Sequence, residues 1–150
     1  MTDVSRDPAV QALLDRTDVS DVLYRYASTI DRKDYDGLRA VFADDARGRY
    51  GDRDWVIGAD AIVAWIADVG RAQAWQHHLV SVYHVDVDGD TARAVTYHTS
   101  YQAELVDTDT VKQIVARYHD ELRRTRAGWK IVSKTMETLW RETRHVPQAR

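Results

Sequence analysis

Three polar residues have side chains suited to proton transfer, and the local pattern turns each toward an apolar interior. Asp31 lies beside the apolar face of an expected helix, at its C-terminal end, where the helix dipole does not favour a carboxylate. Tyr26 lies on that same face. His77 has the strand parity of the apolar residues Val85 and Val87. A histidine can accept a proton near neutral pH, a carboxylate can orient it, and a tyrosine hydroxyl can stabilise an oxyanion.

Each of these residues also has a simpler interpretation. Asp31 is equally a turn residue before the next helix, and His77 a core or half-exposed histidine. Tyr26 and Tyr50 are typical amphipathic core residues whose hydroxyl reaches a partner or water. The residues alone leave both interpretations open.

On the two strands expected after the one that carries His77, alternation gives further candidates for contact with a ligand. These residues are His98, Glu104, Tyr118, Asp120 and Arg124. A single bulge would reverse the assignments beyond it.

The elements that must position these side chains divide the chain into a helical half and a strand half. Helices are expected over residues 8–15, 18–32, 34–42 and 59–71, with short strands over 47–51 and 55–57 and long strands over 74–88, 91–106, 111–125 and 129–141. Asp88-Gly89-Asp90 is a hairpin signal, and tight turns between long strands predict an antiparallel sheet. The fold class is therefore α+β, with three N-terminal helices and a fourth covering a curved sheet around a pocket.

Composition narrows the class of protein. The 150 residues include 21 basic and 24 acidic ones, which gives a net charge of −3. This balance lacks the excess of positive charge that is typical of nucleic-acid-binding proteins. No apolar run is long enough to span a membrane, and the first residues lack a secretion signal, so we expect a cytoplasmic protein. Cysteine is absent, and His77 and His78 point to opposite faces of a strand, so no metal site is expected. The length suits a single domain, residues 1–150, with a core at about 9–141.

The order of elements and several short segments resemble the SnoaL-like domains of the nuclear transport factor 2-like superfamily, which have a cone-shaped α+β fold with a deep pocket. The segments are Tyr26-Ala-Ser-Thr-Ile-Asp31-Arg-Lys-Asp-Tyr-Asp-Gly-Leu, Phe42-Ala-Asp-Asp-Ala, Gln76-His77-His78-Leu79-Val80, Asp88-Gly89-Asp90-Thr-Ala92, Tyr118-His-Asp120 and Gly128-Trp129-Lys-Ile. The resemblance covers about residues 9–141 and indicates the fold more strongly than the substrate.

Within that superfamily the site is most similar to those of scytalone dehydratase, bile acid 7α-dehydratase and hexachlorocyclohexane dehydrochlorinase. The resemblance implies a catalytic dyad of Asp31 and His77, with tyrosines of the dehydratases falling on Tyr26 and Tyr50. The second tyrosine of scytalone dehydratase is Ile30 here. The second histidine of scytalone dehydratase corresponds to a position near Glu104, and its pocket asparagine corresponds to a position near Tyr118. Because these residues differ, scytalone is not the expected substrate.

The implied function is a cofactor-free lyase of the dehydratase type, acting on a small hydrophobic cyclic, polyketide-like or steroid-like molecule. Isomerisation or cyclisation would use the same base and the same oxyanion stabilisers. The alternative is a non-catalytic ligand-binding or assembly module, which the superfamily also contains. Apolar residues expected on the outer strand faces, Val80, Val82, Tyr97 and Tyr101, predict a homodimer or homotrimer.

Overall fold

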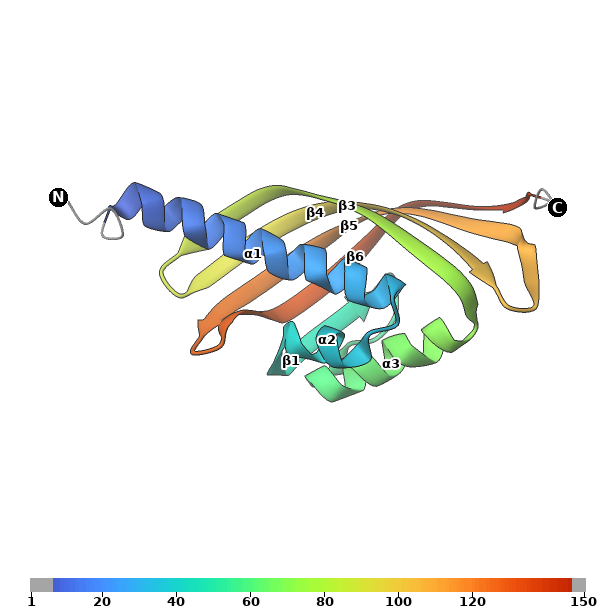
Figure 1. Cartoon of the computed structure of the whole chain (residues 1–150), viewed down its shortest axis with the longest axis horizontal. Helices are drawn as coiled ribbons and strands as arrows, with labels where there is room; N and C mark the ends of the chain where they lie inside the picture. The colour runs from blue at the N-terminus through green and yellow to red at the C-terminus, as the bar shows by residue number, and fades with distance from the viewer. Residues whose placement is uncertain (1–6, 147–150) are drawn as a thin grey trace.

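A computed structural model describes residues 7–146, in which three helices pack on one curved six-stranded sheet (Figure 1). The elements in chain order are α1 (Pro8–Asp31), α2 (Tyr35–Ala40), β1 (Phe42–Tyr50), β2 (Val56–Ile57), α3 (Ala59–Arg71), β3 (Gln73–Asp88), β4 (Thr91–Glu104), β5 (Asp107–Thr125) and β6 (Gly128–His145). The predicted α+β class is confirmed.

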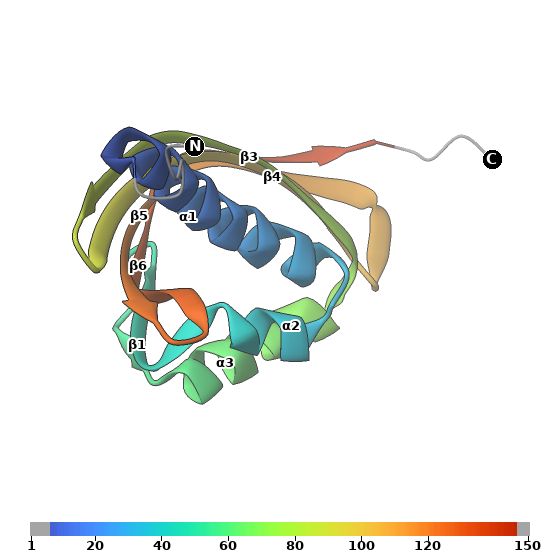
Figure 2. The same cartoon turned by 60° about the vertical axis from the view of Figure 1, so that its left-hand side comes forward.

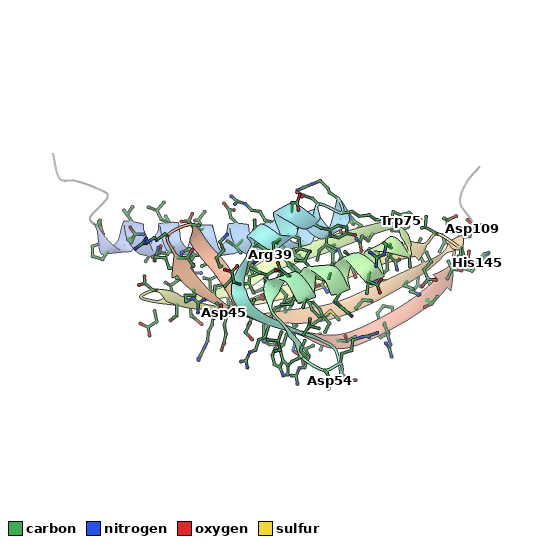
Figure 3. The ribbon with its side chains drawn as sticks, turned by 90° about the horizontal axis from the view of Figure 1, so that it is seen from below. Arg39, Asp45, Asp54, Trp75, Asp109 and His145 are labelled. Atoms are coloured by element: carbon green, nitrogen blue, oxygen red, sulfur yellow. The ribbon has the colours of Figure 1, made fainter. Side chains whose placement is uncertain are left out.

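The sheet has the strand order β2-β1-β6-β5-β4-β3. The four long strands are antiparallel neighbours, as tight turns between them predict, whereas β1 lies parallel to β6 and makes the sheet mixed. Figure 2 shows the sheet curling around α1, while α2 and α3 lie across the open side. The β4–β5 hairpin and the end of β6 project together beyond the helices, where Figure 3 labels Asp109 and His145.

The N-terminal region forms one helix where the sequence predicted two. Asp7 caps its first turn by accepting a hydrogen bond from the backbone N–H of Ala9. Thr17, which lies between the two expected helices, donates its hydroxyl to the carbonyl of Leu13, a bond that forms inside a continuous helix. The residues 7–146 therefore contain three helices in place of the predicted four.

The apolar stripe of α1 and the inner face of the sheet form the core. Val19, Leu23 and Ile30 of α1 are buried in one apolar cluster with Ile131 of β6 and other residues of the sheet. Phe42, expected to end a helix, begins β1 and is 2% exposed. No helix among residues 7–146 combines the length and the apolar character needed to cross a membrane.

The outer face of the sheet carries apolar side chains that the structure leaves uncovered. Leu79, Tyr83, Tyr97 and Leu139 are between 40% and 59% exposed, and all four line a hollow of about 350 Å³. Tyr97 was expected on this face. Val80 and Val82 were also expected here, but Val80 lies opposite the buried His98 and Val82 packs against the core.

We propose that a second copy of the chain covers this face in a homodimer or homotrimer, because monomers seldom expose contiguous apolar area of this kind. Light scattering at micromolar concentration should give a dimer or trimer for the wild-type chain. Leu79→Arg should give a monomer, since it places a charge in the contact. Leu13→Arg on the exposed side of α1, where Leu13 is 65% exposed, should leave the assembly intact. A monomeric wild-type chain would contradict the proposal.

Candidate active site

Asp31, the last residue of α1, makes two contacts with one residue of β3. Its Oδ2 accepts a hydrogen bond from the backbone N–H of His78 at 2.9 Å, and its Oδ1 lies 2.5 Å from the ring Nδ1 of His78. The side chains of Asp31 and His78 are 20% and 11% exposed. A carboxylate at a helix C-terminus faces the negative end of the helix dipole, so these two contacts supply the partner that the helix does not.

Two further hydrogen bonds hold the end of α1 against the start of β3. The side-chain amide of Gln76 donates to the carbonyl of Ile30 at 2.7 Å, and the ammonium of Lys33 donates to the carbonyl of Gln73 at 2.7 Å. Both bonds are accepted by backbone carbonyls at the ends of elements, and the Ile30 carbonyl also accepts from the backbone N–H of Lys33 at 3.0 Å. They fix the distance between helix and strand at the level of Asp31.

His77, the histidine predicted to partner the carboxylate, lies exposed on the outer face, and His78 takes the predicted place. The cause is a β-bulge, because the register of β3 against β4 shifts between Val82 and His84. Simple alternation counted back from the buried Val85 does not allow for this bulge. It therefore assigns every side chain before the bulge to the wrong face of the sheet. Asp31 therefore pairs with the histidine that follows the predicted one in the sequence.

The contact also determines what the His78 ring can do. An ionised Asp31 carboxylate favours the tautomer with the proton on Nδ1, because that nitrogen then donates to Oδ1. The second nitrogen, Nε2, is then left as the basic atom of the ring. This arrangement matches the requirements of a general base with an orienting carboxylate.

His98 of β4 lies in a stack between His78 and Tyr118. Its ring centroid is 5.0 Å from that of His78 and 4.7 Å from that of Tyr118, with interplanar angles of 17° and 25°. Burial, with smaller contributions from His78 and Lys134, lowers the pKa of His98 to about 3. Both ring nitrogens are buried without a hydrogen-bond partner among residues 7–146. A neutral imidazole in this state has a donor and an acceptor available to a bound molecule.

Three tyrosines complete the interior polar cluster. The hydroxyls of Tyr26 and Tyr50 are 3.2 Å apart, and the Tyr26 ring packs edge-on against Tyr118 at 5.7 Å. Burial is the largest cause of a pKa raised above the ordinary tyrosine value in all three. Their hydroxyls therefore stay protonated across the physiological range and can donate hydrogen bonds. Tyr26, Tyr50 and Tyr118 lie together, as the sequence predicted for the first two.

Asp120 forms a buried ion pair with a residue that sequence reasoning missed. Lys134 Nζ lies 2.8 Å from Asp120 Oδ1 and 3.0 Å from Oδ2, and their side chains are 1% and 0% exposed. The ammonium also lies 4.1 Å from the ring centroids of both Tyr26 and Tyr118. Burial raises the pKa of Asp120 and lowers that of Lys134, while the ion pair opposes both shifts.

Two predicted ligand contacts lie elsewhere. Glu104 pairs with Lys112 beside the β4–β5 hairpin, because the register with β5 shifts after Ala103. Arg124 pairs with Asp15 at 2.8 Å and with Asp90 at 3.0 Å, which ties the start of α1 to the β3–β4 turn. Glu104 and Arg124 therefore form structural ion pairs at opposite ends of the sheet. His98, Tyr118 and Asp120 are the predicted residues of this group that join the interior cluster.

Within the described part of the chain, no group of three or more His, Asp or Glu side chains is arranged to hold a metal ion.

A family model for SnoaL-like domains matches residues 11–135. The chain belongs to the SnoaL-like family. An uncharacterised protein of Mycobacterium tuberculosis is 29% identical over 130 residues, covering 84% of this chain and 86% of the relative.

Solved structures show the same fold. A candidate scytalone dehydratase from Novosphingobium aromaticivorans has a TM-score of 0.83 at 17% identity, covering 94% of this chain and 95% of that one. A hexachlorocyclohexane dehydrochlorinase from Novosphingobium barchaimii has a TM-score of 0.82 at 15% identity, covering 93% and 99%. These likenesses confirm the predicted α+β fold of this SnoaL-like chain.

The lowered pKa of His98 predicts acid sensitivity of the fold. The His98 ring takes up a proton below about pH 6.5 in the unfolded chain, but only near pH 3 in the folded chain. The free energy of unfolding is therefore unaffected by this ring above pH 6.5 and decreases as the pH falls below that value. Between pH 7 and pH 5 this one group should cost about 2 kcal/mol of unfolding free energy.

Urea unfolding of wild-type and His98→Phe chains at both pH values measures this contribution. Phe keeps the stacked ring and cannot titrate, so the variant should lose about 2 kcal/mol less than the wild-type chain on going from pH 7 to pH 5. An equal loss in both chains would show that His98 takes up its proton as easily in the folded chain as in the unfolded one.

Proposed function

We propose that the chain is a cofactor-free lyase of the dehydratase type, acting on a small hydrophobic cyclic, polyketide-like or steroid-like molecule. The observation that carries the proposal is the contact between Asp31 and His78, which leaves Nε2 as a base in an interior where His98 is stacked between His78 and Tyr118. The named activity of the dehydrochlorinase neighbour, which is also an elimination, supports the same class of chemistry.

The first step would be removal of a proton from the carbon next to a carbonyl. The lone pair on Nε2 of His78 takes the proton, and the C–H electron pair moves into the carbonyl to form an enolate. Asp31 stabilises the imidazolium through the Nδ1 contact, and a tyrosine hydroxyl donates to the enolate oxygen.

The second step would expel a hydroxyl group from the β-carbon. The enolate electrons return to form a carbon–carbon double bond as the C–O bond breaks, and the imidazolium gives its proton to the leaving hydroxyl to form water. The base is regenerated, and neither an oxidant nor a reductant is needed. His78 would therefore act first as base and then as acid.

The surroundings of His78 favour this cycle energetically. The neighbouring His98 stays neutral, so it does not oppose the positive charge that develops on His78. The ammonium of Lys134 lies against the Tyr26 and Tyr118 rings and attracts the negative charge of an enolate held by their hydroxyls. Burial strengthens both effects, because the interior screens charge less than water does.

Replacing the two members of the dyad should abolish most turnover. As a probe we choose 3-hydroxy-1-tetralone, which becomes fluorescent 1-naphthol when it loses water. His78→Gln and Asp31→Asn should each reduce the rate at least about 100-fold, and the double variant should lose no more than either single one, because the residues act as a unit.

His77→Gln is the matched control, since His77 is the exposed neighbour of His78 and should keep its rate within about two-fold. Equal losses at both histidines would contradict the assignment. Binding of the tetralone without 1-naphthol formation, and without exchange of its α-proton in D₂O, would favour a ligand-binding module. Exchange without loss of water would favour an isomerase or cyclase.

A further inference from the structure

A groove of about 1080 Å³ lies where β1 ends and β6 continues without it. Pairing between these strands stops at Tyr50 and Met136, and Gly51 donates its N–H to the Met136 carbonyl as the chain turns away. Tyr50 lines this groove, and its hydroxyl contacts that of Tyr26. The groove therefore borders the candidate active site.

Three arginines line the groove: Arg49 near the end of β1, Arg53 in the loop that follows β1, and Arg141 on β6. All three are exposed, and none forms an ion pair with another residue of the 7–146 range. The acids in the groove are Asp52 and Glu137. Glu137 already contacts Arg117 at 3.6 Å and His119 at 3.1 Å, so its charge is matched. The groove thus has a surplus of positive charge.

Aromatic stacking holds two of these arginines in place. The Arg49 guanidinium lies 5.1 Å from the Trp55 ring centroid, and the Arg53 guanidinium lies 5.8 Å from that of Trp65. Trp65 in turn stacks on Tyr50 at 4.7 Å and 22°. Stacking occupies the face of a guanidinium and leaves the N–H groups at its rim free to bind an anion. Figure 3 shows the loop between β1 and β2, which contains the labelled Asp54, at the lower edge of the molecule.

We propose that this groove binds an anionic group of the substrate, a carboxylate or a phosphate, while the reacting carbon lies beside His78. The proposal rests on the proposed function and specifies its substrate class as an amphiphilic anion with an apolar ring. Planar guanidinium groups bind carboxylates and phosphates through paired hydrogen bonds. The wall formed by Arg53, Trp65 and Tyr50 joins the charged end of the groove to the interior hydroxyls.

Equilibrium binding tests this subsite without requiring turnover. The probes are 2-naphthoate, its neutral and nearly isosteric counterpart 2-naphthamide, and inorganic pyrophosphate, followed by tryptophan fluorescence and calorimetry at low salt. We expect at least one anion to bind about ten-fold more tightly than the amide. Tighter naphthoate identifies a carboxylate on the substrate itself, whereas tighter pyrophosphate identifies a phosphate-bearing substrate.

Arg53→Gln and Arg141→Gln should each weaken anion binding about three- to ten-fold and leave amide binding unchanged. Arg126→Gln, an equal change of charge in the exposed β5–β6 turn, is the matched control and should have no effect. Anions that bind no better than the amide would overturn the proposal, as would an equal effect of Arg126→Gln. His78→Gln should retain anion binding, so failure of the lyase chemistry is distinguishable from failure of this subsite.

Discussion

The two contacts between the last residue of α1 and His78 are the constraint on which the interior depends. One of them uses the backbone N–H of β3, so it sets the position of the helix on the sheet as well as the orientation of a ring. Tyr26 lies five residues earlier on the same helix and is thereby placed against Tyr50 and Tyr118. The stack of His98 on His78 follows from the same placement.

The interior holds two acid–base pairs on either side of a neutral imidazole. Asp31 with His78 lies at one end of the stack and Asp120 with Lys134 at the other, and His98 lies between them. Burying the second pair costs desolvation free energy that the ion pair and the two tyrosine rings around the ammonium offset. A buried lysine without a partner would favour its neutral form, so Asp120 is the residue that keeps a cation beside the Tyr26 and Tyr118 rings.

The sequence predicted well whatever depends on uninterrupted periodicity. The apolar stripe of α1 placed Tyr26 and Asp31, and regular alternation on β4 placed His98 inward. Bulges explain two of the failures on the strands. A shift near Val82 exchanged His78 for His77, and another between β5 and β6 turned Lys134 inward, although alternation from Ile131 would place it outside. Bulges depend on pairing with a neighbouring strand, which one strand's sequence does not encode.

Nitrogen-15 NMR of the histidine rings tests the central claim, that Asp31 orients His78 as a base, most directly. Long-range nitrogen–proton correlations at pH 7.5 distinguish the two tautomers of each ring. In the wild-type chain the neutral His78 ring should carry its proton on Nδ1 with Nε2 unprotonated, and Asp31→Asn should shift this population toward Nε2–H. A His78 ring already protonated on Nε2, or one that does not respond to Asp31→Asn, would contradict the claim.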